Sequence, residues 1–443
     1  MKRYYIDPFG CAKNQVDAEN MMAHLNLSGW EASDAGEADL IIVNSCGFIE
    51  SAKRESLDAV FAWRKLYPEK KILLAGCLAE RYGKELAETL HEADGFFGIG
   101  GLAGINAAAS GLFGRKKQSV KSAALTAAMG ERPLLSLPGS AYIKISEGCD
   151  NRCSYCAIPL IRGGLRSRSI DNILDECRAL LDRGIRELCI IAQDIASYSG
   201  DFGRSLALEQ AGLPSLLEAV SRLKGEFWVR LLYIHPDNFP LPVLDILKSD
   251  NRFLPYFDLP FQHGSEKILR LMNRKGNAET YLKLLEKIRS RLPDAVIRTT
   301  FMTGFPGEGD DDFDMLLDFQ EKAGPDWMGC FAYSREEDTQ AYSMKKRVPK
   351  KTAAARKKIL EERQIAITEK KMDRFVNKEF KVLVEEKIEG EESIWLGRLY
   401  CHAPDIDGSA VIRSRRELVP GGFAIGRVFA RAGFDLEVEA VQP

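Results

Sequence analysis

The stretch Ile145–Arg168, ISEGCDNRCSYCAIPLIRGGLRSR, carries three cysteines at Cys-x-x-x-Cys-x-x-Cys spacing. A 4Fe-4S cube normally takes four thiolates, and Cys149, Cys153 and Cys156 would supply three of them. No fourth cysteine or histidine follows closely. The spacing therefore indicates a cluster with one iron left open to bind a small molecule.

Other uses of cysteine fit this chain less well. A zinc site needs four ligands, and the next cysteines, Cys177 and Cys189, lie in apolar segments too far along to close a compact site. Ten cysteines in 443 residues is a modest density for a disulfide framework, and the start MKRYYIDPFG lacks the apolar core of a secretory signal. We therefore expect a cytosolic protein with reduced thiols. Four cysteines are expected only to pack in apolar or strand-like segments: Cys177, Cys189, Cys330 and Cys401.

Length and composition set the broad class. A chain of 443 residues suggests about three domains, and 45% hydrophobic residues can bury large cores. No apolar run approaches the roughly 20 residues of a membrane helix. The formal net charge of −2 provides no global basic field for nucleic acid.

The first hundred residues alternate between short apolar runs and longer amphipathic runs. The short runs predict strands at Tyr4–Asp7, Leu40–Asn44 and Ile72–Ala75, and the longer runs predict helices at Val16–Leu27, Ser51–Tyr67 and Leu78–Leu90. Such alternation is typical of a parallel sheet with crossover helices.

Each of these strands runs into a cysteine, at Cys11, Cys46 and Cys77. Loops at the carboxyl edge of a parallel sheet converge on one crevice, and the helix after each loop offers a positive end that favours thiolate. Free cysteine is also often a small buried hydrophobe. Spacing alone therefore leaves two interpretations open, a second metal site or three buried thiols.

From Ala141 the strand and helix alternation resumes over about 190 residues. Strands are predicted at Tyr142–Ser146, Glu187–Gln193, Phe227–Tyr233, Tyr256–Pro260, Val296–Met302 and Trp327–Tyr333, with helices including Ile170–Arg183, Pro214–Lys224, Glu266–Met272 and Glu279–Arg291. Six such units indicate a partial barrel, in which residues at strand carboxyl ends line the site. Taken singly, each strand-end residue would be a capping or turn residue. Their shared position makes them site candidates: Gln193, Asp194, His235, Gln262, His263 and Gly304.

One motif imitates a dinucleotide-binding fingerprint, Gly98-Ile-Gly100-Gly-Leu-Ala103. The strand before it is too short, and about twenty residues on, where an acidic residue should meet the ribose, the chain is basic at Arg115–Lys121. The sequence therefore argues against nicotinamide binding. The basic, Ser/Ala-rich stretch Arg115–Ser136 is more typical of a linker.

The end of the chain has a different character. Lys350–Arg374 has helical period and dense alternating charge, which predicts a solvated connecting helix. After Phe375, short β-rich runs with turns at Ile406–Gly408 and Pro420–Gly422 predict a small β-barrel. Residues 375–443 contain nine Lys/Arg and twelve Asp/Glu, whereas a phosphate-binding surface should be basic. The acidic barrel favours a basic protein partner and makes direct nucleic-acid binding doubtful.

Together these segments resemble the methylthiotransferases, a family of radical S-adenosylmethionine enzymes, over essentially the whole chain. The resemblance implies an N-terminal cluster domain (1–114), a linker (115–138), a central partial (β/α)6 barrel with its connecting helix (139–374) and a C-terminal TRAM domain (375–443). Four stretches resemble the RimO-type enzymes specifically: Gly10–Asp17, Asn44–Ile49, Cys156–Gly163 and Asp258–His263.

The resemblance implies the chemistry of the site. Cys149, Cys153 and Cys156 would ligate the cluster that cleaves S-adenosylmethionine to an adenosyl radical, which abstracts hydrogen from an unactivated carbon. Cys11, Cys46 and Cys77 would ligate a second 4Fe-4S cluster that holds the sulfur to be transferred. The candidate contacts to S-adenosylmethionine are the backbone near Tyr155, the side chains of Gln193, Asp194 and Gln262, and the stretch Thr300–Glu308.

RimO-type enzymes place a methylthio group on the β-carbon of an aspartate in small-subunit ribosomal protein twelve. The resemblance therefore implies that protein, free or in the ribosomal subunit, as partner, together with an electron donor such as flavodoxin or ferredoxin. The family commonly has threonine at Ser45, serine at Ala18 and a leucine-like residue near Phe9. None of these departures removes a ligand.

Two alternatives remain in view. The first is a methylthiotransferase acting on transfer RNA adenosine. The second is a non-catalytic iron-sulfur module that binds RNA through its last domain, although an electron-transfer protein would normally complete each cluster with a fourth ligand.

Overall fold

The computed structural model describes residues 2–114, 132–201 and 212–441. By its internal contacts the chain forms two compact units. The first comprises Met1–Leu135, Glu147–Arg166 and Ser334–Tyr342, and the second comprises Ser136–Ser146, Ser167–Tyr333 and Ser343–Pro443. Most of the predicted linker, residues 115–131, lies outside the described residues. The cysteine loop of the central segment thus belongs to the same unit as the N-terminal sheet.

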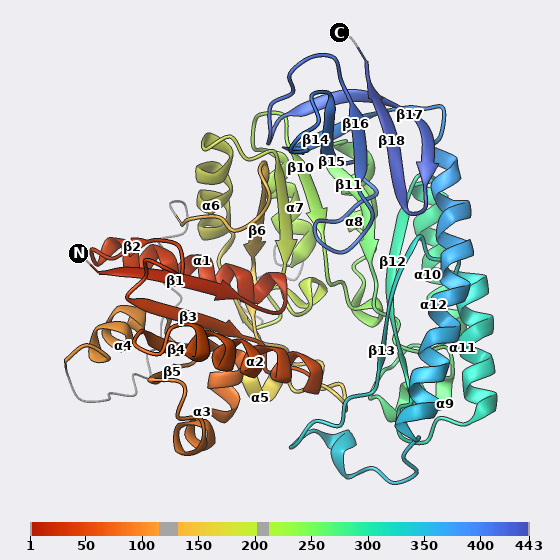
Figure 1. Ribbon diagram of the computed structural model, residues 1–443. Helices are drawn as coiled ribbons and strands as arrows, with labels where there is room; N and C mark the ends of the chain where they lie inside the picture. Colours follow the sequence, from red (N-terminus) through yellow and green to blue (C-terminus); the bar gives the residue numbers. More distant parts are fainter. Residues whose placement is uncertain (1, 115–131, 202–211, 442–443) are drawn as a thin grey trace. The chain divides into compact units, whose positions relative to one another are not determined.

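The first unit is built on a parallel sheet with strand order β2-β1-β3-β4-β5 (Figure 1). Its strands are β1 (Arg3–Pro8), β2 (Glu31–Ala32), β3 (Leu40–Ser45), β4 (Lys71–Gly76) and β5 (Gly95–Phe97). Its helices are α1 (Ala12–Leu27), α2 (Glu50–Leu66), α3 (Cys77–Thr89), the short η1 (Leu102–Gly104), α4 (Ile105–Gly111) and α5 (Ile158–Arg162). The three strands and three helices predicted for this region are confirmed.

Alternating side chains of the central strands explain why helices cover both faces of this sheet. Leu40 and Ile42 pack in a core with α1 and α4, whereas Ile41 and Val43 pack in a second core with α2 and α3. Because successive side chains of a strand point to opposite faces, a strand that is apolar throughout must be buried on both sides. The crossover arrangement expected from the sequence follows from this pattern.

The glycine turn that imitates a dinucleotide fingerprint is already hydrogen-bonded to a side chain of the protein. The carboxylate of Glu80 accepts hydrogen bonds from the amides of Ile99, at 2.8 Å, and Gly100, at 3.3 Å. A protein carboxylate thus takes amides that a phosphate would use in a nucleotide-binding turn, in agreement with the argument made from the sequence.

The second unit contains a six-stranded parallel sheet with order β13-β12-β11-β10-β9-β6 (Figure 1). Its strands are β6 (Ser140–Lys144), β9 (Glu187–Ile191), β10 (Trp228–Leu231), β11 (Phe253–Asp258), β12 (Val296–Thr303) and β13 (Trp327–Ala332). All six predicted strands are present, in sequence order across the sheet, which confirms the partial barrel. Two very short strands, β7 (Ser146–Glu147) and β8 (Arg166–Ser167), pair at the two ends of the cysteine loop.

Helices connect these strands. They are α6 (Ile170–Asp182), α7 (Leu213–Ser221), α8 (Val243–Ser249), α9 (Glu266–Leu271), α10 (Ala278–Arg291) and α11 (Asp310–Ala323), with short η2 (Ile195–Ser197) and η3 (Pro236–Asn238). After β13 come α12 (Lys350–Met372) and η5 (Asp373–Phe375), and η4 (Gln340–Ser343) lies mostly in the first unit. The predicted connecting helix is confirmed as α12. It buries a narrow stripe at a spacing of three or four residues and exposes the rest, which suits its alternating charge.

The C-terminal segment closes into a five-stranded barrel, as predicted. Its strands are β14 (Glu379–Lys387), β15 (Ile394–Arg398), β16 (Ala410–Arg413), β17 (Phe423–Ala432) and β18 (Asp435–Ala440), in the order β14-β15-β16-β18-β17. Within the second unit a loop of this barrel packs on the parallel sheet. The hydroxyl of Tyr256 in β11 donates to Asp407 at 2.6 Å, and Nη1 of Arg230 in β10 donates to the carbonyl of Tyr400 at 2.9 Å.

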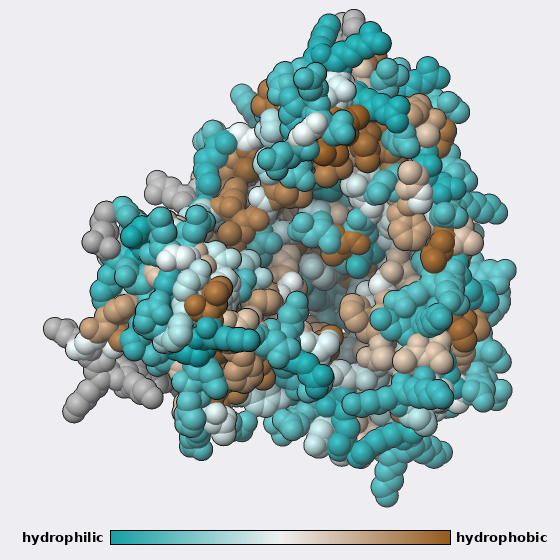
Figure 2. All heavy atoms as spheres, in the orientation of Figure 1, coloured by the Kyte–Doolittle hydropathy of each residue, from teal (hydrophilic) through white to brown (hydrophobic). Residues whose placement is uncertain are grey.

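On the side that Figure 2 draws, hydrophilic side chains cover most of the surface and hydrophobic ones gather in patches between them. Across residues 2–114, 132–201 and 212–441, no helix combines the length and the apolar character needed to span a bilayer.

Candidate functional site

The three N-terminal cysteines lie at one edge of the first sheet. Cys11 is the N-cap residue of α1, three residues after β1 ends, Cys46 follows β3 directly, and Cys77 is the first residue of α3 directly after β4. The three strands are neighbours in the sheet and all run parallel. The expectation that these residues, distant in sequence, would come to the same carboxyl edge is confirmed. We call Cys11, Cys46 and Cys77 the front trio.

A buried asparagine ties the loops of the front trio together. The amide nitrogen of Asn14 donates to the carbonyls of Phe9 at 2.7 Å, Asn44 at 3.1 Å and Ser45 at 3.2 Å. Its side-chain oxygen lies 3.8 Å from Sγ of Cys77. One amide therefore fixes the ends of β1 and β3 and contacts the third thiol. Sequence reasoning missed this role, although Asn14 lies three residues after a strand-end cysteine.

Glycines allow these loops to approach each other closely. A Cβ on Gly10 would lie 2.9 Å from Cβ and 3.2 Å from Sγ of Cys46, and Gly10 has a φ of +90°. A Cβ on Gly47 would lie 2.8 Å from the carbonyl oxygen of Cys77. Because only glycine lacks this atom, the sequence permits close contact between all three cysteine-bearing loops.

The environment of the front trio is not uniform, which corrects the expectation that helix ends favour thiolate at all three. At Cys11 desolvation is outweighed by Lys13 and Arg162, and the pKa of the thiol falls below its usual value. Burial raises the pKa of Cys46, and it raises the pKa of Cys77 to about 12 despite the opposing effect of Arg162. At these two positions the loss of hydration on burial is the largest cause of the shift in pKa.

The central cysteines lie on a loop that closes on itself. The amide of Cys149 donates to the carbonyl of Gly163 at 3.1 Å, and the amide of Cys156 donates to the carbonyl of Cys153 at 3.0 Å. Gly148 has a φ of +74°, and a Cβ there would lie 2.0 Å from the carbonyl oxygen of Gly164. The two ends of the loop are therefore in backbone contact at Gly148, where there is no room for a side chain. We call Cys149, Cys153 and Cys156 the central trio.

The loop of the central trio packs against the front trio within the first unit. Ala157 and Ile161 form a buried cluster with Cys77, against which Phe48 and Ile99 pack. Helix α5, which follows Cys156 closely, thus rests on α3, which begins with Cys77. Two sets of cysteines that are separated by more than seventy residues in the sequence belong to one compact body.

The residues present fit two iron-sulfur clusters. Each cysteine of the central trio is half-buried on its closed loop, whereas Cys177, Cys189, Cys330 and Cys401 are all buried, as the packing interpretation predicted. Within the part of the chain that the structure describes, no three His, Cys, Asp or Glu side chains are arranged to hold a single metal ion. A cube has a different requirement, because it binds each thiolate at a separate iron.

The candidate contacts to S-adenosylmethionine other than Tyr155 belong to the second unit. Gln193 follows β9 and is half-buried, and its amide nitrogen has no hydrogen-bond partner among the described residues. Asp194 accepts from the amides of Ala196 at 2.9 Å and His235 at 3.0 Å and from the hydroxyl of Ser197 at 2.6 Å. Gln193 therefore offers an unused donor, whereas Asp194 mainly caps η2 and joins the ends of β9 and β10.

His235 and His263 are also engaged within the protein. Nδ1 of His235 accepts from the amide of Asp237 at 3.3 Å, and Nδ1 of His263 accepts from the amide of Ser265 at 2.9 Å. Burial, together with Arg274, lowers the pKa of His235 to about 4. The capping interpretation is thus confirmed for His235, whose ring is neutral at neutral pH.

Gln262, four residues beyond the end of β11, meets Thr300 within β12. The amide of Gln262 donates to the carbonyl of Thr300 at 2.8 Å, and the carbonyl of Gln262 accepts from the amide of Met302 at 2.8 Å. Gln262 has a φ of +69°, a conformation that costs energy for any residue except glycine. Nearby, the amide of Gly304 donates to the carboxylate of Glu308 at 2.7 Å. The backbone at this edge is held in a defined and strained form.

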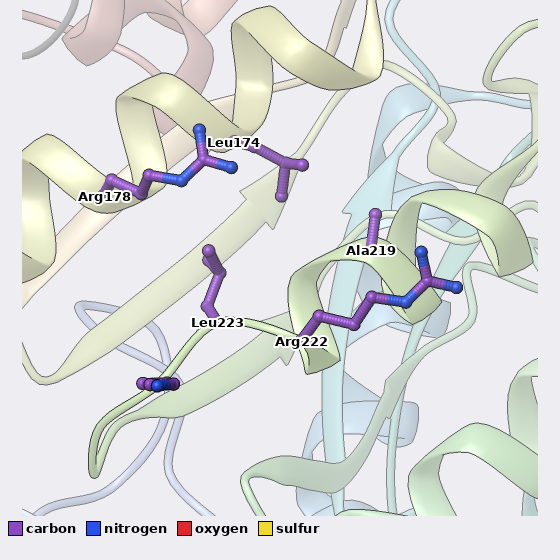
Figure 3. Close-up of a pocket in the computed structure, with 6 residues that line it drawn as sticks. Leu174, Arg178, Ala219, Arg222 and Leu223 are labelled. Carbon is purple, nitrogen blue, oxygen red and sulfur yellow. The ribbon is translucent and has the colours of Figure 1, made fainter.

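A surface pocket elsewhere in the second unit contains none of the candidate residues. Figure 3 shows Arg178 of α6 and Arg222 at the end of α7 on its two sides, with Leu174, Ala219 and Leu223 between them. This pocket lies among the outer helices, whereas the candidate contacts lie at strand ends. It carries no part of the site.

Comparison with known proteins agrees with this geometry. Over 98% of its length the chain is 48% identical to the ribosomal protein uS12 methylthiotransferase RimO of Treponema denticola, the whole of which is covered. The chain belongs to the RimO methylthiotransferase family. The RimO of Syntrophomonas wolfei is 38% identical over 96% of this chain and 97% of its own, and that of Pseudothermotoga lettingae is 38% identical over 98% and 99%.

Family models divide this RimO-family chain along its length. Residues 143–319 match the radical SAM superfamily, residues 3–98 match a family described as uncharacterized protein family UPF0004, and residues 376–441 match the TRAM domain. Membership of the radical SAM superfamily implies a 4Fe-4S cluster and S-adenosylmethionine as cofactors, and makes this RimO-family chain an enzyme.

Solved structures support the fold. The radical S-adenosylmethionine methyltransferase TsrM from Kitasatospora setae has a TM-score of 0.56 and 14% identity, with coverage of 77% of this chain and 74% of that one. The cobalamin-dependent radical enzyme OxsB has a TM-score of 0.51 and 13% identity, with coverage of 84% and 56%. At such identity these likenesses concern the fold alone.

Proposed function

We propose that this chain transfers a methylthio group to the β-carbon of an aspartate in ribosomal protein uS12, with the central trio and the front trio each holding a 4Fe-4S cluster. The observation that carries the proposal is that both trios belong to one compact unit, in which α5 packs on Cys77. A reaction that needs a radical and a sulfur atom at the same carbon requires both metal centres near each other.

The central trio would hold three irons of the first cluster and leave the fourth open to the amino acid part of S-adenosylmethionine. When bound, the two clusters supply an electron that cleaves S-adenosylmethionine and a sulfur atom for transfer. The contacts of Gly148 and Cys149 with Gly164 and Gly163 close the loop that carries the three thiols. A closed loop of this kind would hold the three thiolates in place for the cluster.

The residues at the strand ends would bind the rest of S-adenosylmethionine. Gln193 has an unused amide donor suited to a carboxylate or ribose oxygen. Gln262 and Thr300 lie on the strained backbone after β11 and on β12, and the backbone near Tyr155 would face the adenine. Asp194 would act mainly by holding the loop that presents Gln193, because its carboxylate is engaged within the chain.

The C-terminal barrel would recognise the protein substrate. Residues 375–443 carry a net negative charge, which suits a basic ribosomal protein better than the phosphates of RNA. An external one-electron donor such as flavodoxin or ferredoxin would reduce the first cluster.

The test is intact-mass analysis of uS12 after anaerobic incubation with the reconstituted chain, S-adenosylmethionine, sulfide and a reductant. We expect uS12 to gain the mass of one methylthio group in place of a hydrogen, at a single aspartate located by fragmentation. Transfer RNA incubated in parallel should stay unmodified. Modification of adenosine in place of uS12 would overturn the proposed substrate.

Two cysteine variants test whether the front trio is needed for methylthio transfer but not for cleavage of S-adenosylmethionine. Cys46→Ala should still cleave S-adenosylmethionine reductively but should not transfer the methylthio group. Cys177→Ala removes a buried thiol of α6 that has no role in the proposal, and it should keep both reactions. Methylthio transfer by Cys46→Ala would contradict the role of the front trio.

A further inference from the structure

Arg162 links the two sets of cysteines through its side chain. It is the last residue of α5, six positions after Cys156, and its side chain is 1% exposed. One guanidinium nitrogen, Nη2, lies 3.1 Å from Sγ of Cys77 and also donates to the carboxylate of Asp17 at 2.9 Å. The other, Nη1, donates to the carboxylate of Glu147 at 2.8 Å. A charged donor on the central loop therefore contacts a sulfur of the front trio.

The two carboxylates hold the guanidinium in place. Asp17 comes from α1 of the N-terminal sheet and Glu147 comes from the start of the cysteine loop, and both are buried. The flat guanidinium matches two carboxylates at defined angles, so the orientation of the donor toward Cys77 is fixed. Burial of three charges without water would be costly unless each had a partner, and the arrangement gives each one.

The position of this donor has a chemical consequence. The reduction potential of an iron-sulfur cluster depends on its net charge, its exposure and the hydrogen bonds that its sulfurs accept. A positive donor on a ligand sulfur stabilises the more negative, reduced form of a cluster, and a nearby carboxylate does the opposite. Arg162 and Asp17 should therefore act on the potential in opposite directions.

We propose that Arg162 is a positioning residue that raises the reduction potential of the cluster held by the front trio, through its contact with Sγ of Cys77, and that Asp17 and Glu147 aim it. The inference rests on the proposed function, because it requires a cluster at the front trio. It extends that function by giving the central loop a direct electrostatic influence on the sulfur-carrying centre.

A purely structural role is the competing explanation, since a buried arginine with two carboxylates could simply fasten the loop to the sheet. Such a role would make the variants of Arg162 and Asp17 lose cluster or stability, with no reason for potential shifts of opposite sign. The sign of the shift therefore distinguishes the two explanations.

The experiment uses the full chain with Cys149, Cys153 and Cys156 replaced by alanine, so that only the front trio can bind a cluster. Iron and acid-labile sulfide are measured first, and one 4Fe-4S cluster per chain is expected. Absence of this cluster would overturn the second-cluster part of the proposed function, and the inference with it.

Redox titration monitored by electron paramagnetic resonance then compares variants in this background. Arg162→Gln should shift the midpoint to more negative potential by an amount that changes the ratio of reduced to oxidised cluster about tenfold, which is about 59 mV for one electron. Asp17→Asn should shift it to more positive potential. Arg415→Gln, on the C-terminal barrel and exposed, is the matched control and should leave the midpoint unchanged.

Each outcome decides the inference. Opposite shifts with unchanged iron content support it, and no shift, or shifts of the same sign, overturn it. If Arg162→Gln fails to hold the cluster, Arg162→Lys decides, because lysine keeps the positive charge but lacks the planar fork that contacts Sγ of Cys77 and two carboxylates together. A more negative midpoint then supports the inference and an unchanged one overturns it.

Discussion

Arg398 of the C-terminal barrel donates to Glu187 at the start of β9, with Nη2 and the carboxylate oxygen 2.5 Å apart and both side chains buried. Glu187 also accepts from Nε of Arg230 at 2.7 Å and from the hydroxyl of Ser140 at 2.8 Å. Burial opposes ionisation of Glu187, but the two arginines outweigh it and hold the pKa at about 2. The barrel is thus attached to the parallel sheet by a buried network of charged and polar side chains.

We predict that Arg398→Met destabilises the protein by about 3–5 kcal/mol, because it leaves the charge of Glu187 buried with one partner fewer. Chemical denaturation followed by circular dichroism measures the change. Arg413→Met is the matched control, since the side chains of Arg413 and its partner Glu437 are 58% and 27% exposed and loss of their pair should cost no more than about 1 kcal/mol. Equal losses of stability from the two substitutions would show that burial does not make the Arg398–Glu187 pair more important for stability.

The same interface should make stability depend on pH. His402 is buried edge-on against Trp327, and burial, together with Arg398 and Arg230, lowers its pKa to about 3. The unfolded chain binds a proton near pH 6.5 that the folded chain does not bind until about pH 3. This contribution to stability is present above pH 6.5 and is lost as the pH falls toward 3, by about 1.4 kcal/mol per pH unit.

His402→Asn tests this contribution, because an amide oxygen can replace the ring nitrogen that accepts from the amide of Leu399. The free energy of unfolding of the variant should depend less steeply on pH between 4 and 6.5 than that of the unchanged chain. His24 lies on α1 and is partly exposed, so His24→Asn should leave most of the slope in place. Parallel pH profiles for His402→Asn and the unchanged chain would rule the explanation out.

Sequence patterns predicted the strands well because the parallel strands are buried on both faces. Leu40–Ser45 is apolar for four residues and wholly buried, so its signal is strong. The short strand β2, Glu31–Ala32, is exposed and has no such signal. Strands that depend on a neighbour for pairing and bury little apolar surface cannot be recognised from composition.

The site was only partly accessible from the sequence. The position of the cysteines at strand ends located the front trio. It did not show that Gln193 has an unused donor whereas Asp194 caps η2, because that difference depends on where the backbone amides after Asp194 point. Arg162 was not foreseen either, because an arginine in a glycine-rich loop is usually solvated. Its burial follows from Asp17 and Glu147, which only the folded chain brings together.

Gly10→Ala should reduce cluster binding by the front trio. The added methyl group would lie 2.9 Å from Cβ of Cys46 at a φ of +90°, so that backbone strain and crowding both displace the thiols. Gly29→Ala separates the two effects, since Gly29 has a φ of +82° and open space around it. Both variants should lose about 1–2 kcal/mol of stability, but only Gly10→Ala should lower the iron content. Equal iron in the two would mean that close approach of these loops is not needed.

Gln193→Leu tests whether Gln193 contacts S-adenosylmethionine or only packs within the protein, because the two roles predict different changes in stability and in affinity. An unpaired, half-buried amide costs free energy, so leucine, which has no polar group, should leave the melting temperature unchanged or raise it. If Gln193 binds S-adenosylmethionine, the same substitution should weaken binding about tenfold, which corresponds to the loss of one hydrogen bond to a charged group. Equilibrium dialysis with the reconstituted enzyme measures the affinity for S-adenosylmethionine, and calorimetry measures the melting temperature.

Gln364→Leu is the control for Gln193→Leu. The amide nitrogen of Gln364 donates to the carbonyl of Pro325 and the hydroxyl of Thr368, so loss of this amide should lower the melting temperature without changing the affinity. A Gln193→Leu enzyme with unchanged affinity would remove this residue from the binding site.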